Sequence, residues 1–113
     1  MSDFIHVTTT LPTANEALEL AKSLVEKSLA ACVQVVGPVT SVYRWQGKIE
    51  TAEEWQCQIK TRRALYVAVK QAILAVHPYE VPELLATPVD TGNQKYLEWL
   101  RQETQVRADT SES

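Results

Sequence analysis

Several features that mark common classes of protein are missing from this sequence. No apolar run approaches the ~18–20 residues that a membrane-spanning helix needs, so no membrane protein is predicted. The N-terminal MSDFIHVTTT has no charged stretch followed by an apolar one, so no secretory signal is indicated and we expect a cytosolic protein. The three glycines are isolated from one another, which excludes a glycine-rich phosphate loop. With a formal net charge of -3, the chain also lacks the basic surface of a nucleic-acid-binding protein.

Cysteine is scarce as well. The chain has two, Cys32 and Cys57, and they form no C-x-x-C motif and match no zinc-finger spacing. As free thiols they fit the reducing conditions of the cytosol. Each could serve simply as a small hydrophobic side chain.

What is present is the composition of an ordinary globular protein. The chain has 113 residues, of which 45% are hydrophobic and 22% charged. This length suffices for one core but not for two. We therefore predict a single domain over residues 1–105, followed by a polar, disordered tail over residues 106–113.

The chain alternates between strand-like and helix-like patterns. Alternating or β-branched residues predict strands at 4–11, 31–45, 48–62 and 84–89. Apolar residues at helical spacing predict helices at about 14–29, 64–76 and 94–104. The order βαββαβ, with one extra C-terminal helix, indicates an α+β protein with the ferredoxin-like fold. That fold has one antiparallel sheet with both main helices on one face, and we expect the long hairpin to form its central pair of strands.

The first helix has the clearest signals. Thr13 is placed to cap its N-terminus, with Glu16 reaching back toward the cap. Its apolar residues recur at i, i+3, i+4 and i+7, and this stripe includes Leu18 and Val25. We expect both side chains to be buried against the sheet.

The pattern that dominates the chain is a β-hairpin over residues 31–62, with Gln46-Gly47 at its turn. Its first arm of about fourteen residues would extend more than ~40 Å, whereas a domain of this size is only ~25–30 Å across. Part of the hairpin should therefore project, and residues 50–54, which are weak strand formers, should lie exposed near its tip. Gly37-Pro38 predicts a bulge in the first arm.

Three aromatic side chains lie close to this tip, namely Tyr43, Trp45 and Trp55. In a single copy of the chain these three side chains would be largely exposed to solvent. The face of the sheet opposite the two main helices would also have no helix to cover it. We expect these three residues to contact other copies of the chain, the alternative being an aromatic ligand cage.

Five segments carry a resemblance to a known family. They are LVEKSLAACV (24–33), SVYRWQGKIE (41–50), IKT (59–61), HPYEVPELL (77–85) and YLEWL (96–100). In this order within one small domain, they resemble the CutA divalent-cation tolerance proteins. The resemblance covers residues 4–103 and implies a ferredoxin-like fold, a tight homotrimer and kinship with the PII signalling proteins. It also implies a link to divalent metals, especially copper, with no cofactor required.

The resemblance suggests where Cu²⁺ or another divalent metal would bind. Cys32 and His77 lie in matching family segments, and Glu83 could add an oxygen ligand. These residues are distant in sequence, so a site would have to be assembled in space, between subunits. Met1 is the only methionine, which argues against a thioether-rich copper site. His77, which precedes Pro78, could instead act only as a helix stop.

A polar cleft between subunits is a second candidate site, because PII-like trimers hold small ligands in such grooves. Its candidate lining residues are Arg44, Lys60, Arg62 and Tyr79, and their cationic groups could hold an anion. Alternatively, Lys60 and Arg62 only solvate the end of a strand.

Catalysis is not predicted, because a Cys32–His77 pair lacks an orienting third group and an oxyanion hole. The sequence thus predicts a trimeric, non-catalytic divalent-cation tolerance protein with weak metal binding. A PII-like small-molecule sensor or scaffold is the alternative, and a stable trimeric interaction platform is a third.

Overall fold

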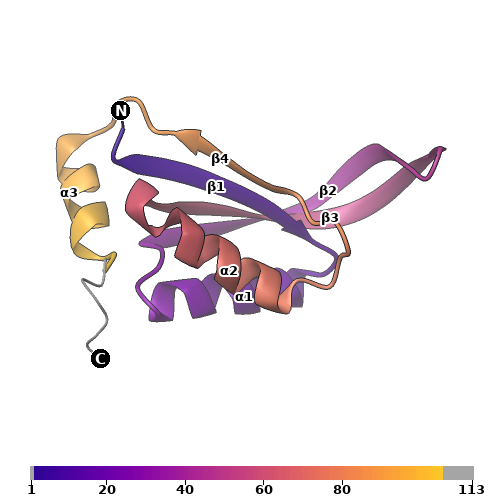
Figure 1. Cartoon of the computed structure of the whole chain (residues 1–113), viewed down its shortest axis with the longest axis horizontal. Helices are drawn as coiled ribbons and strands as arrows, with labels where there is room; N and C mark the ends of the chain where they lie inside the picture. The colour runs from indigo at the N-terminus through magenta and orange to yellow at the C-terminus, as the bar shows by residue number, and fades with distance from the viewer. Residues whose placement is uncertain (1, 106–113) are drawn as a thin grey trace.

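The computed structural model describes residues 2–105, and its elements follow the predicted order (Figure 1). The strands are β1 (Phe4–Leu11), β2 (Cys32–Trp45), β3 (Lys48–Arg62) and β4 (Leu84–Pro88). The helices are α1 (Ala14–Glu26), α2 (Tyr66–Val76) and α3 (Gln94–Gln102), and a 3₁₀ turn (Arg63–Leu65) precedes α2. The predicted α+β, ferredoxin-like fold is confirmed. The predicted tail over residues 106–113 lies outside the described residues.

The four strands form one antiparallel sheet in the order β2-β3-β1-β4. The prediction that both hairpin strands are central is wrong for β2, which lies at an edge. The reason is that β1 pairs with β3 along its whole length, from Phe4 opposite Arg62 to Leu11 opposite Trp55. Helices α1 and α2 lie together on one side of the sheet, and α3 lies at the end remote from the hairpin tip (Figure 1).

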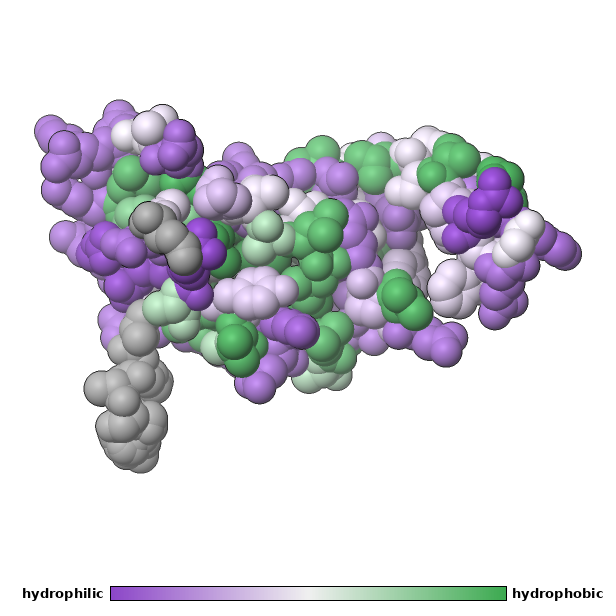
Figure 2. Space-filling model, turned by 45° about the horizontal axis from the view of Figure 1, so that its top comes forward, coloured by the Kyte–Doolittle hydropathy of each residue, from purple (hydrophilic) through white to green (hydrophobic). Residues whose placement is uncertain are grey.

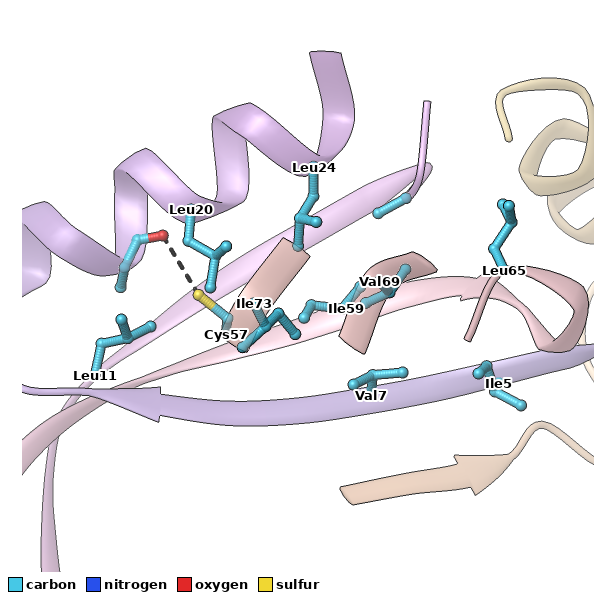
Figure 3. Close-up of a cluster of buried hydrophobic side chains, with 12 residues drawn as sticks. Ile5, Val7, Leu11, Leu20, Leu24, Cys57, Ile59, Leu65, Val69 and Ile73 are labelled. Atoms are coloured by element: carbon cyan, nitrogen blue, oxygen red, sulfur yellow. Dashed lines mark hydrogen bonds between the residues drawn. The ribbon is translucent and has the colours of Figure 1, made fainter. Parts of the chain in front are cut away.

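The core lies between the sheet and these two helices (Figure 3). Val7 and Ile59 are opposite each other in β1 and β3, so they point to the same face, and both are fully buried. Cys57 is equally buried, and its thiol donates a hydrogen bond to the Ala17 carbonyl oxygen at 3.3 Å. Burial raises the pKa of the Cys57 thiol to about 11, so this residue acts as a protonated core side chain.

Helix α1 begins as predicted but ends three residues early. The Thr13 hydroxyl oxygen accepts a hydrogen bond from the Glu16 backbone N–H at 3.1 Å, which satisfies one free donor of the first turn. The chain leaves the helix where Ser28 adopts a positive φ of 59°, after Glu26. Leu18 and Val25 are 45% and 44% exposed, so their predicted burial is wrong. The sheet instead packs against the face that carries Ala17, Leu20, Ala21 and Leu24.

The hairpin bends where it was expected to. The pairing of β2 with β3 shifts register between Val36 and Val39, at Gly37-Pro38. The indole ring of Trp55 lies across this bulge and packs partly buried against the core. Because β1 ends opposite Trp55, the rest of the hairpin has no further strand beside it in the described chain and projects from the body (Figure 1). The molecule is 45 Å along its longest axis.

Candidate functional site

A hollow of about 880 Å³ lies where the hairpin leaves the sheet. Residues 41–45 of β2 form one wall, and residues 78–83 of the loop between α2 and β4 form the other. Thr10 and Glu54 complete the lining. We call this hollow the hairpin groove.

Strand alternation explains which hairpin side chains face the groove. Trp55 and Cys57 point toward the helices, so Glu54 points to the opposite face of β3. Beyond the bulge, Ser41 is opposite Ala52 and Tyr43 is opposite Glu50, which places Ser41 and Tyr43 on the same face as Glu54. The loop from α2 reaches this face because β1 has already ended.

His77 fixes that loop to the sheet. Helix α2 ends at Val76, and His77 is its C-cap. The backbone of His77 is extended (φ -72°, ψ 131°) because Pro78 follows. Its Nε2 lies 2.7 Å from the Thr10 carbonyl oxygen, and its Nδ1 accepts a hydrogen bond from the Tyr79 backbone N–H at 3.2 Å. An acceptor at one nitrogen and a donor at the other require a neutral imidazole with its hydrogen on Nε2. Both ring nitrogens of His77 are therefore engaged within the chain.

Glu54 is the buried charge of the groove. It is 7% exposed, and its Oε2 accepts a hydrogen bond from the Tyr79 hydroxyl at 2.8 Å. Among residues 2–105, no cationic side chain forms a salt bridge with it. Burial and then the bond to Glu54 raise the pKa of the Tyr79 phenol, which keeps its hydroxyl a donor. Among the described residues the other Glu54 oxygen, Oε1, is not a buried atom without a partner, so it is open to the groove and can accept a further hydrogen bond.

Sequence reasoning missed Glu54 and expected it to be exposed with its neighbours at residues 50–54. No local pattern separates it from Glu50 or Glu53. Its hydrogen-bond partner Tyr79 comes from a loop that is distant in sequence.

Two of the four predicted cleft residues come together. Arg44 and Tyr79 line the groove from its two walls. Lys60 and Arg62 lie at the other end of β3, and the stretch from Glu54 to Lys60 corresponds to ~20 Å of strand. Within one chain, the four residues therefore do not form one cleft.

Lys60 and Arg62 have partners of their own. The Lys60 ammonium donates to the Gln34 side-chain oxygen. The Arg62 guanidinium donates to the Thr104 hydroxyl at 3.0 Å and to the Thr104 carbonyl oxygen at 2.9 Å. Arg62 thus ties the end of β3 to the segment that follows α3.

The three predicted metal ligands are also spread over the chain. Glu83 lines the groove and His77 lies beside it, but Cys32 pairs with Lys60 at the other end of the sheet. There, burial and then the neighbouring Cys32 thiol raise the pKa of the Tyr96 phenol. Among residues 2–105, no three histidine, cysteine or acidic side chains gather closely enough to hold a metal ion. A metal site made from Cys32, His77 and Glu83 would require a second subunit and stays a prediction.

The residues predicted as subunit contacts differ in exposure. Tyr43 and Trp45 are 45% and 38% exposed, whereas Trp55 is partly buried by its own chain. Val42 and Ile49, also on the projecting hairpin, are exposed to a greater extent. Figure 2 shows such apolar side chains along the projecting end of the molecule. Their role as contacts stays a prediction.

Comparisons with known proteins agree with one another. A family model described as CutA1 divalent ion tolerance protein matches residues 5–103. Protein CutA of Homo sapiens is 46% identical over 101 residues, which cover 89% of this chain and 56% of that protein. Divalent-cation tolerance protein CutA of Thermus thermophilus is 44% identical over 95 residues, which cover 84% of this chain and 92% of that protein. The chain thus spans about half the length of its human relative.

The same fold recurs in solved structures. The divalent cation tolerance protein Cut A1 of Thermus thermophilus superposes with a TM-score of 0.88 at 42% identity, over 90% of this chain and 99% of that one. The names of the Thermus thermophilus protein and structure describe tolerance to divalent cations and no reaction. The names of some other relatives concern their location. They place the relatives in different compartments, since two plant proteins are called chloroplastic and an Archaeoglobus fulgidus protein periplasmic. In the part of this chain that the structure describes, no helix is long and apolar enough to cross a membrane.

Proposed function

This chain belongs to the CutA1 family of divalent ion tolerance proteins, and on that premise we propose that it is a homotrimer that contributes to divalent-cation tolerance without catalysing a reaction. We place it in the cytosol, where its two free thiols would stay reduced. Family membership supports the link to divalent cations.

The projecting hairpin is the observation that supports an assembly. It carries the exposed apolar side chains of Val42, Tyr43, Trp45 and Ile49 beyond the body of the chain. Within the described residues, β2 and β4 are also sheet edges without a partner strand. A closed ring of identical copies would cover the apolar ribbon and give each edge a partner.

The uncovered sheet face supports the same assembly. Val36 is opposite Gln56 and Leu85 is opposite Thr8, so both point away from the helices. They are 45% and 63% exposed. Sheets packed face to face would bury them.

Light scattering on the purified full chain tests the trimer. One copy has a mass of 12.7 kDa, so three copies give about 38 kDa (three times 12.7). Ile49→Lys should lower this mass, because it places a charge on the projecting hairpin at an apolar residue that does not line the groove. Val67→Lys, at an equally exposed apolar position on helix α2 (62% for both residues), should leave it unchanged. A wild-type mass of one copy would refute the assembly.

We further propose that a divalent metal, with Cu²⁺ best suited to a thiol and an imidazole, binds weakly to Cys32, His77 and Glu83 from different subunits. Weak binding follows because His77 must give up an intrachain hydrogen bond to present a ring nitrogen. Calorimetric titration of Cu²⁺ and Zn²⁺ should show loss of binding in a Cys32→Ala/His77→Ala variant. Glu83→Gln should weaken binding and Glu53→Gln, which removes an exposed carboxylate elsewhere, should not. Equal binding by wild type and the double variant would remove these ligands from the proposal.

A second candidate function is a small-molecule sensor or scaffold. The hairpin groove favours it, because about 880 Å³ falls within the ~300–1,000 Å³ typical of ligand pockets. A compound that binds the native protein there must raise the melting temperature of the wild type, and a tighter-binding compound must raise it further at the same free concentration. A trimeric protein whose melting temperature responds to neither metals nor small molecules would instead be an interaction platform.

A further inference from the structure

The hairpin groove has a composition that selects the charge of its ligand. Its charged lining residues are three carboxylates, Glu54, Glu80 and Glu83, and one guanidinium, Arg44, which gives a net charge of -2 (one minus three). The cationic residues that would have favoured an anion, Lys60 and Arg62, lie elsewhere. The field in the groove therefore favours a cation.

Aromatic rings line the same space. Tyr43 and Trp45 contribute from the hairpin and Tyr79 from the loop. A cation placed over an aromatic face within ~6 Å of its centroid is attracted by the ring. The groove thus combines negative charge with ring faces, and this combination suits a cation that has an apolar body.

We propose that the hairpin groove binds a small organic cation, an amine or quaternary ammonium on an aromatic or apolar body, with Glu54 as its counter-charge. This deepens the second candidate function and rests on it. Glu54 is 7% exposed and forms no salt bridge among residues 2–105. Its Oε2 accepts the hydrogen bond from the Tyr79 hydroxyl, which leaves Oε1 for a ligand. An ammonium group next to the other oxygen supplies the missing positive charge.

The geometry favours an organic cation over a metal ion in the groove. A metal ion needs three or four ligand atoms at ~2.0–2.3 Å. Glu54 lies on β3 and Glu80 and Glu83 lie on the loop, and no three potential ligands gather among the described residues. An organic cation needs one carboxylate and spreads its remaining contacts over the rings.

Hydrogen bonds hold the groove open before any ligand arrives. The loop is joined to β1 by His77 at Thr10 and by the Thr9 hydroxyl, which donates to the Glu83 carbonyl oxygen at 2.7 Å. Tyr79 joins it to the hairpin through Glu54. A preformed site loses less conformational entropy on binding than a site that must be ordered.

Matched probes of one shape and different charge test the proposal. Tyramine carries an ammonium, 4-ethylphenol is neutral, and 4-hydroxyphenylacetate carries a carboxylate on the same ring. Isothermal titration of each into the wild-type chain should give at least tenfold tighter binding of tyramine than of either other probe. Glu54→Gln keeps an acceptor for the Tyr79 hydroxyl and should weaken tyramine binding at least tenfold. Glu53→Gln, the neighbouring exposed residue on the other face of β3, should leave it unchanged.

Three results would overturn the proposal. The first is equal affinity for the cationic and anionic probes, and the second is equal tyramine affinity in wild type and Glu54→Gln. The third is the absence of tyramine binding; a lower assembly mass for Glu54→Gln would then indicate that the groove receives a second copy of the chain. Since every lining residue belongs to one chain, the titration reports on the groove even where the protein is monomeric or binds no metal.

Discussion

Replacing Gly37 with alanine probes how the hairpin is bent against the core. A Cβ atom at this position would lie 2.3 Å from Cδ1 and 2.6 Å from Cγ of the Trp55 indole ring. Both distances are far shorter than a normal carbon–carbon contact of ~3.5–4.0 Å. The ring is partly buried against the core, so it cannot simply swing into solvent. Either the bulge or the indole must shift.

The size of the effect follows from two opposing contributions. Forcing a methyl group into a packed site costs ~1–3 kcal/mol. Gly37 does not adopt a positive φ, so alanine also restricts the unfolded chain, which alone would stabilise the native state by ~0.4–1 kcal/mol. We therefore expect Gly37→Ala to lower the free energy of unfolding by ~1–2 kcal/mol.

Urea unfolding followed by circular dichroism at one fixed protein concentration measures this change. Gly92→Ala is the matched control, because its new Cβ would lie 3.4 Å from Leu97, close to an ordinary contact, and should be nearly neutral. Trp55→Leu removes the ring atoms that the new methyl group meets, so Gly37→Ala should cost little in that background. The reasoning is refuted if the Gly37→Ala chain is as stable as the Gly92→Ala chain. It is also refuted if Gly37→Ala lowers the free energy of unfolding by the same amount in the Trp55→Leu background as in the wild type.

Three further predictions concern stability. Burial raises the pKa of Cys57 from 9.0 to about 11, so the unfolded chain loses this proton first and stability should fall by up to ~2–3 kcal/mol as pH rises between these values; urea unfolding at about pH 8 and about pH 10.5 should show a smaller loss for Cys57→Ala. Thr13→Ala should cost ~1 kcal/mol by removing the cap of α1, and Thr13→Ser, which keeps the hydroxyl, should cost much less in the same assay. His77→Ala removes the bonds to Thr10 and Tyr79 and should lower stability by ~1–3 kcal/mol and speed amide hydrogen exchange at Tyr79; unchanged exchange would show that the loop is held otherwise.

The elements of the fold could be predicted because local patterns determine them. β-branched alternation defined β1 at Phe4–Leu11, and Gln46-Gly47 marked the hairpin turn between β2 and β3. Gly37-Pro38 marked the register shift, because proline cannot donate to a strand ladder and glycine leaves room for the indole. Each of these signals lies within a few residues of the feature that it predicts.

What sequence reasoning missed depends on contacts between distant segments. Val25 continues the helical periodicity of α1, but it lies outside the face that packs on the sheet and is 44% exposed. Likewise β2 becomes an edge because β1 occupies the other side of β3. Glu54 has its hydrogen-bond partner on a loop more than twenty residues away, and this partner, Tyr79, was assigned to a cleft with Lys60 and Arg62 that one chain does not form. Charge and residue type identified plausible site residues, whereas the topology of the fold determined which of these residues contact one another.

The hairpin extends beyond the end of β1, and this also affects how a newly synthesised chain folds without aggregating. Within the described residues, a single copy exposes two open strand edges and the apolar side chains of the projecting hairpin, which are features that promote aggregation during folding. Charged side chains interrupt the projecting hairpin at Arg44, Lys48, Glu50 and Glu53, and they act as gatekeepers against indiscriminate strand pairing. Glu50 and Glu53, which belong to the weak strand-forming segment 50–54, thus also protect the single chain against aggregation.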